Sequence, residues 1–138
     1  MSHFRRLDEK VLVAGQIGPD DVATAAAEGI VAIVNNRPDG EEPGQPDGIV
    51  IRAAAEAAGM GYFHIPVAGG VSPNMVADAA KVIEAAPGPV LFFCRSGTRS
   101  AFLWALARFS GGADGATLLG QAAAAGYDLS PIRPHLGG

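Results

Sequence analysis

Short apolar runs that alternate with helix-length segments constrain the fold of this chain more than any other feature. The predicted strands are residues 11–13, 30–34, 62–65 and 90–93. The predicted helices are residues 19–29, 49–58, 73–86, 100–109 and 113–125. The second and fourth strand runs are apolar at every position, as in a parallel sheet that is covered on both faces. The alternation therefore predicts an α/β fold with a mainly parallel central sheet of about four to five strands, flanked by helices.

Length and composition indicate one domain, residues 1–138. Of the 138 residues, 49% are hydrophobic and 17% are charged, which is a globular composition. The net charge is -4 and, apart from Arg5 and Arg6, the basic residues are dispersed, so nucleic acid is not an expected partner. No apolar leader segment follows Met1 and no run is long enough to span a bilayer, which predicts a cytoplasmic protein with no membrane partner. None of these features predicts the oligomeric state.

Cys94 is the only cysteine of the chain. An internal disulfide is therefore impossible, and a reducing compartment would leave this thiol free. Lone cysteines are usually buried core residues, so an inert structural thiol is the simplest expectation. No group of histidine, cysteine and acidic residues has the spacing of metal ligands, so we predict neither a metal nor another cofactor.

Residues 94–100, called here the cysteine loop, join a predicted buried strand to a predicted helix. A helix N-terminus stabilises a thiolate and attracts an oxyanion, and Gly97 can adopt the positive φ that turns successive amides inward. Arg99 can hold two oxygens of a phosphate or a sulfur oxyanion, and Ser100 can donate its hydroxyl to the sulfur. We predict Cys94, Arg99 and Ser100 as catalytic residues. A small anionic substrate, either a phosphate or a sulfane sulfur compound, is expected to bind Arg95, Ser96, Gly97 and Thr98.

The cysteine loop and three further segments resemble the phosphatase-like domain of β-lactamase hydrolase-like proteins. The matching segments are 93–100 (FCRSGTRS), 15–17 (GQI), 35–42 (NNRPDGEE) and 125–129 (AGYDL). That family is similar to a branch of the cysteine phosphatase superfamily, so the resemblance implies a dual-specificity-phosphatase-like fold. It also implies that Cys94 is a nucleophile that forms a phosphocysteine, that Arg99 binds the phosphate, and that amides of the loop supply the remaining hydrogen bonds.

Two features depart from the usual phosphatase pattern. Phe93 stands where a histidine usually precedes the cysteine, and four residues rather than five separate Cys94 from Arg99, a spacing similar to single-domain rhodaneses. Residues 67–72 also lack the carboxylate that usually protonates the leaving oxygen. Three hypotheses stay open: a phosphatase-like hydrolase, which we favour, a rhodanese-like sulfurtransferase carrying a persulfide on Cys94, and a noncatalytic anion-binding module.

Residues 37–48, called here the acidic loop, are the alternative source of an acid. They include three prolines, three glycines and four acidic residues, a composition that predicts an exposed loop, and such loops often carry function. Asp39, Glu41 and Glu42 lie on this loop and could reach the site. Asp39 is our candidate for the general acid, against the simpler role of a solvated turn residue. Arg37 is a weak candidate for the mouth of the site, with pairing to Glu42 as an equal alternative.

Overall fold

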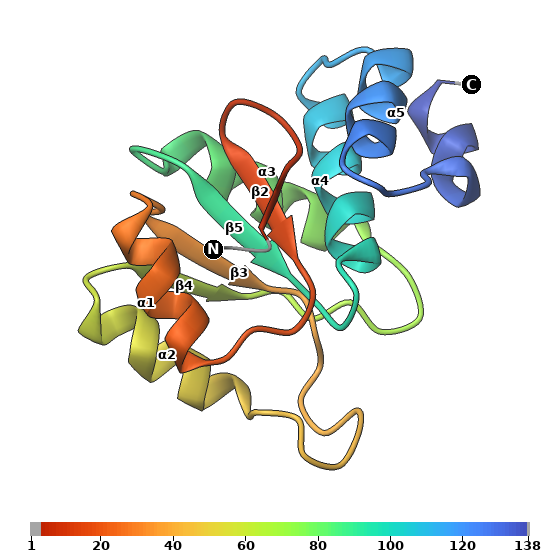
Figure 1. The fold of residues 1–138 in the computed structure, drawn as a ribbon. Coiled ribbons are helices and arrows are strands. Elements are labelled where there is room, and N and C mark those ends of the chain that lie inside the picture. Colours follow the sequence, from red (N-terminus) through yellow and green to blue (C-terminus); the bar gives the residue numbers. More distant parts are fainter. Residues whose placement is uncertain (1–3, 138) are drawn as a thin grey trace.

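The computed structural model describes residues 4–137 and contains a five-stranded sheet in the order β1-β2-β5-β3-β4 (Figure 1). The strands are β1 (Arg5–Arg6), β2 (Val11–Ala14), β3 (Ala32–Asn35), β4 (Gly61–His64) and β5 (Val90–Phe93). The helices are α1 (Pro19–Ala27), α2 (Gly48–Ala57), α3 (Pro73–Ala85), α4 (Thr98–Ser110), α5 (Gly115–Ala124) and the 3-10 helix η1 (Ser130–Leu136). Strands β2, β5, β3 and β4 are mutually parallel, and β1 pairs with β2 antiparallel. The predicted α/β fold with a mainly parallel sheet is confirmed.

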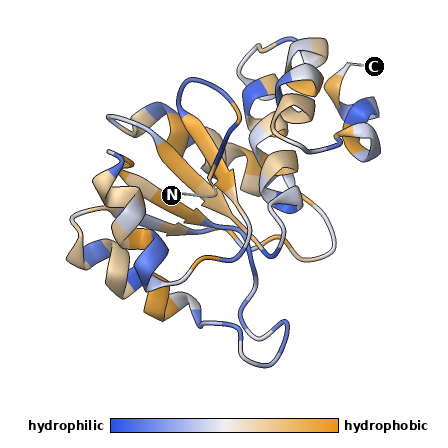
Figure 2. Cartoon of the chain, in the orientation of Figure 1, coloured by the Kyte–Doolittle hydropathy of each residue, from blue (hydrophilic) through white to orange (hydrophobic). Residues whose placement is uncertain are grey.

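Helices cover both faces of the sheet (Figure 1). The core under α1 and α2 contains Leu91 and Phe93 of the central strand β5, and the core under α3 and α4 contains Val90 and Phe92. Successive side chains of a strand point to opposite faces, so β5 supplies both cores, and all four of its side chains are buried. Figure 2 shows the strands as a hydrophobic layer and the acidic loop as a hydrophilic extension below it.

Most element boundaries differ from the predicted ones by one or two residues, and two short elements were not predicted. Strand β3 begins at Ala32, later than predicted, because the Ile30 N–H donates to the Ala25 carbonyl at 3.1 Å and closes the end of α1. Strand β1 and helix η1 lie outside the predicted elements, since β1 is a pair of exposed arginines and η1 carries Pro134. Among residues 4–137, no helix has the length and apolarity needed to cross a bilayer.

A buried carboxylate fastens α4 to the turn before β2. Asp8 is 9% exposed, and its Oδ2 accepts hydrogen bonds from Trp104 Nε1 at 2.7 Å and from Arg108 Nε at 2.9 Å. The amides of Lys10 and Val11 donate to its Oδ1, both at 2.8 Å. Burial alone would raise the pKa of Asp8, but the donors from Arg108, Trp104 and these amides outweigh it and leave the pKa below its ordinary value.

The carboxyl ends of the four parallel strands meet at one edge of the sheet. The segments that follow these strands include Gly15 and Gln16 after β2, Asn36 after β3, Val67 beyond β4 and Cys94 after β5. Ligands of open α/β sheets bind at this edge, beyond the ends of the strands. The fold therefore brings the cysteine loop and the acidic loop to the same place.

Candidate active site

The sulfur of Cys94 faces the N-terminus of α4. Its Sγ accepts a hydrogen bond from the Gly97 N–H at 3.1 Å, and Gly97 is the N-cap residue of a helix that begins at Thr98, two residues earlier than predicted. The φ of Gly97 is 93°, in the left-handed region, and a Cβ there would overlap the Tyr127 hydroxyl. Glycine is therefore required both by the backbone and by the contact with Tyr127. The arrangement directs the positive end of the helix dipole at the sulfur.

The guanidinium of Arg99 is engaged by a carboxylate of the acidic loop. Its Nη1 donates to Glu41 Oε2 at 2.7 Å and its Nη2 to Glu41 Oε1 at 2.8 Å, a bidentate pair. Nη1 also donates to the Val67 carbonyl at 2.9 Å. The hydrogen bond with Glu41 raises the pKa of Arg99, and the nearby Cys94 sulfur raises it further. In turn Arg99, followed by Arg37, lowers the pKa of Glu41 to about 2, so Glu41 is an anion at neutral pH.

Arg37, the first residue of the acidic loop, holds this loop in place through hydrogen bonds of its side chain. Its side chain is 2% exposed and donates to Glu41 at 2.9 Å, to Glu42 at 2.8 Å and to Gln16 Oε1 at 3.0 Å. Glu42 also lies 3.5 Å from the exposed guanidinium of Arg95. Of the two alternatives drawn from the sequence, pairing with Glu42 is therefore observed for Arg37. Two glutamates thus connect three arginines and hold the acidic loop against the cysteine loop.

Asp39 does not join this network. Its Oδ1 accepts the Gly48 N–H at 2.7 Å, at the start of α2, where the first amides of a helix have no partner within the helix. In this structure Asp39 therefore serves the helix N-terminus, while Glu41, two residues later, contacts Arg99. A general-acid role for Asp39 stays a prediction. The tight turn at Gly40, with a φ of 72°, separates the two carboxylates.

The hydroxyl of Ser100 is also directed differently from the prediction. Ser100 Oγ donates to Asn36 Oδ1 at 2.8 Å, and Asn36 Nδ2 donates to the Ile65 carbonyl at 2.9 Å. All three groups are buried. A serine hydroxyl has one hydrogen, so the predicted donation from Ser100 to the Cys94 sulfur is not made. Instead Ser100 and Asn36 join the start of α4 to the ends of β3 and β4.

Three of the other predicted residues, Arg95, Ser96 and Thr98, lie on the outer side of the cysteine loop. Arg95, Ser96 and Thr98 are exposed, whereas Gly97 is buried. Ser96 Oγ donates to Thr98 Oγ1 at 3.1 Å, and the Thr98 N–H points back to Ser96 Oγ at 3.4 Å. The Ser96 carbonyl accepts from the Tyr127 hydroxyl at 3.2 Å. These contacts fix the turn of the loop.

Cys94 itself is fully buried in this state, with 0% of its surface exposed. Three other residues lie beside it: Glu41 pairs with Arg99, the Val67 carbonyl accepts a hydrogen bond from Arg99, and Tyr127 contacts Gly97. The sequence indicated Glu41 only as one acid of its loop and Tyr127 only as part of the resemblance, and it assigned no role to Val67. A ligand reaches the sulfur only after some of the groups around it move. The contact between Glu41 and Arg99 is the one that a competing anion would replace directly.

The sequence matches known proteins over most of its length. Residues 3–111 match the family described as the beta-lactamase hydrolase-like protein, phosphatase-like domain. A beta-lactamase hydrolase-like protein from Agrobacterium fabrum strain C58 is 43% identical over 103 residues, covering 73% of this chain and 24% of the relative. Another, from Xylella fastidiosa strain Temecula1, is 36% identical over 127 residues, covering 89% of this chain and 29% of the relative. This chain spans less than a third of the length of these relatives.

Solved structures share the fold. The crystal structure of a candidate phosphatase from Neisseria meningitidis Z2491 is similar to this chain with a TM-score of 0.86 and 35% identity, covering 99% of this chain and 97% of that one. Tk-PTP in its active form gives a TM-score of 0.74 at 18% identity, covering 96% of this chain and 92% of that one, which is a likeness of fold alone. The expected dual-specificity-phosphatase-like fold is confirmed.

Proposed function

The chain belongs to the phosphatase-like domain family of β-lactamase hydrolase-like proteins, and from this membership we propose that it hydrolyses phosphate monoesters through a phosphocysteine on Cys94. The observation that carries the proposal is the pair of hydrogen bonds from the Arg99 guanidinium to the Glu41 carboxylate, beside the Cys94 sulfur. A phosphate group presents two oxygens to a guanidinium in the same way as a carboxylate does. Glu41 thus occupies the position that we assign to two oxygens of the substrate.

The proposed reaction has two steps. The Cys94 thiolate attacks phosphorus, so that an S–P bond forms and the bond from phosphorus to the ester oxygen breaks, with the leaving oxygen taking a proton from an acid or from water. Water then attacks phosphorus, gives up a proton, and the S–P bond breaks with its electron pair returning to sulfur. Arg99 and the amides at the start of α4 stabilise the negative charge on the phosphoryl oxygens in both steps.

Displacement of Glu41 precedes the chemistry in this proposal. The phosphate dianion replaces Glu41 on Arg99, which releases one end of the network that holds the acidic loop over the buried sulfur. Arg37 still holds Glu41 and Glu42 after this exchange, so the loop stays anchored near the site. The chemistry also requires Cys94 to remain a free thiol, which the cytoplasm would ensure.

The experiment that tests the proposal is hydrolysis of 4-nitrophenyl phosphate, whose acidic leaving group has the least need of a proton donor. We expect Cys94→Ser to abolish release of phosphate and Arg99→Lys to lower kcat/KM by about 100-fold, because lysine cannot replace the bidentate contact. Arg52→Lys is the matched control, since Arg52 is an exposed arginine that pairs with Glu56 on α2. Full activity of Cys94→Ser would refute a phosphocysteine.

The spacing in the cysteine loop favours a second candidate, sulfur transfer. Four residues separate Cys94 from Arg99, and residues 67–72 carry no carboxylate to protonate a leaving oxygen. In this alternative the thiolate attacks the outer sulfur of thiosulfate, an S–S bond to Cys94 forms, and sulfite leaves with the electron pair of the broken bond. Mass spectrometry after incubation with thiosulfate would show one added sulfur atom. An unchanged mass together with no phosphate release would leave an anion-binding module.

A further inference from the structure

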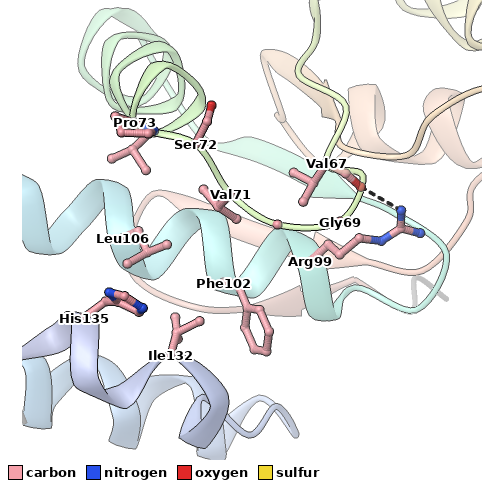
Figure 3. A pocket seen from close by; sticks show the side chains of 12 residues that line it. Val67, Gly69, Val71, Ser72, Pro73, Arg99, Phe102, Leu106, Ile132 and His135 are labelled. Atoms are coloured by element: carbon pink, nitrogen blue, oxygen red, sulfur yellow. Dashed lines mark hydrogen bonds between the residues drawn. The ribbon is translucent and has the colours of Figure 1, made fainter.

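A cavity with a volume of about 730 Å³ lies beside the cysteine loop. It is enclosed by the segment 67–73 that follows β4, by one face of α4, and by η1 (Figure 3). Its walls are mostly apolar, and Val71, Phe102, Leu106 and Ile132 contribute to them. The volume lies within the range of pockets that hold small organic ligands. The proposed phosphocysteine chemistry uses Arg99 but none of the apolar residues of this cavity.

Arg99 belongs both to the proposed catalytic site and to the lining of the cavity. Arg99 lines one end of the cavity, and His135 lies at the opposite end (Figure 3). Val67, whose carbonyl accepts a hydrogen bond from the Arg99 guanidinium at 2.9 Å, lines it as well. A ligand whose anionic group binds Arg99 would therefore have the apolar cavity next to that group.

Helical geometry explains why Arg99 and the apolar wall of the cavity lie together. Arg99, Phe102 and Leu106 are three and four residues apart on α4, the spacing that places side chains on one face of a helix. The segment opposite this face includes Gly69 and Gly70, whose φ values are 79° and 150°. An added Cβ at either glycine would meet no atom within 4 Å, so these positions border open space rather than packed core.

We propose that this cavity binds the hydrocarbon portion of the substrate, so that the chain selects phosphate monoesters of aryl or short alkyl alcohols over small polar phosphates. The phosphate would lie on Arg99 and the hydrocarbon group between Phe102, Val71 and Ile132. The inference rests on the proposed function for the catalytic step, but binding in the cavity does not require turnover. The carrying observation is that Arg99, whose guanidinium we assign to the phosphate, also lines a cavity whose other walls are mostly apolar.

The test is a series of phenyl phosphates with an unbranched alkyl group of zero to four carbons at the 4-position, whose leaving groups have closely similar acidity. We expect kcat/KM to rise by up to about fourfold for each methylene that is buried. Phe102→Ala and, on another wall, Ile132→Asn, which places a polar amide in the cavity, should flatten this dependence. Phe109→Ala is the matched control, because Phe109 is an exposed phenylalanine of α4 that lies outside the cavity.

A parallel binding measurement separates this inference from the proposed function. Calorimetry with methylphosphonate, butylphosphonate and hexylphosphonate, which cannot be hydrolysed, should give tighter binding with each added methylene in the wild-type chain and in Phe109→Ala, but not in Phe102→Ala. That result without phosphatase activity would refute the catalytic proposal and retain the cavity. Activity or phosphonate binding that does not depend on the length of the hydrocarbon would overturn the cavity proposal.

Discussion

Replacing Glu41 with glutamine tests whether the acidic loop competes with substrate for Arg99. Glutamine keeps the size of the side chain and one carbonyl acceptor but removes the negative charge that lies 2.7 Å and 2.8 Å from the two guanidinium nitrogens. In the wild-type chain, the phosphate of the substrate must displace this anion before it can bind to Arg99. In Glu41→Gln it displaces only a neutral amide.

The size of the effect follows from the exposure of the pair. The Arg99 and Glu41 side chains are 26% and 29% exposed, so their interaction lies between a weak surface pair and a buried one. A bidentate pair of this kind is worth about 1 kcal/mol, which corresponds to a change of roughly fivefold in affinity. We therefore expect KM for a small phosphate ester and Ki for inorganic phosphate to fall by about fivefold, with kcat changed by less than about twofold.

Steady-state kinetics with 4-nitrophenyl phosphate at constant ionic strength measures both constants. Glu42→Gln is the matched control, because Glu42 contacts Arg37 and Arg95 but makes no hydrogen bond or ion pair with Arg99 among the contacts described for residues 4–137. An unchanged or raised KM in Glu41→Gln would refute competition for Arg99. A loss of kcat of about 100-fold or more would instead identify Glu41 as the general acid.

Four further outcomes are expected. The pKa of Glu41 is about 2, below its ordinary 4.5. Its ion pairs therefore stabilise the fold fully above about pH 4.5 and lose this effect as the pH falls toward 2. The difference in Tm between wild type and Glu41→Gln should shrink over that interval. Gly97→Ala should lose at least about tenfold in activity, because its Cβ overlaps Tyr127. Gly112→Ala is the comparison variant: Gly112 has a φ of 102° and open space around it, so this variant should lose about 1 kcal/mol of stability in urea unfolding from the backbone alone. Asp8→Asn should lower the free energy of unfolding by about 2–3 kcal/mol, and Asp20→Asn on the surface of α1 should leave it nearly unchanged. Ser100→Ala should lower it by about 1–2 kcal/mol, since Asn36 Oδ1 loses its donor, and Ser110→Ala at the end of α4 is the comparison.

The layers of the fold were predictable because burial leaves a periodic trace in the sequence. A strand covered on both faces must be apolar at every position, and the run Val90–Phe93 meets this condition. The edge strand β1 leaves no such trace, because its two arginines need only their backbone groups to pair with β2. The positive φ of Gly97 was expected from its residue type, but its position as the N-cap was not, so helix α4 begins two residues earlier than expected.

The candidate site was predictable only where its residues are close in sequence. Cys94, Gly97 and Arg99 lie within one turn between a strand and a helix, so their proximity follows from local structure. Glu41 is 58 residues from Arg99, and its position depends on how the acidic loop folds between Asn35 and α2. By composition Asp39, Glu41 and Glu42 could each reach the site, and Asp39 was the acid that we predicted. In the structure Asp39 accepts the Gly48 N–H at the start of α2, and it is Glu41 that contacts the Arg99 guanidinium.

The complete enclosure of the Cys94 sulfur has a practical consequence for inhibitor discovery. Electrophilic fragments screened against the closed chain would find no exposed surface of this thiol. Compounds that carry a carboxylate or phosphonate able to take the place of Glu41 would open their own route to the thiol. Screening in the presence of a weak anion would then reveal covalent hits that an anion-free library screen misses.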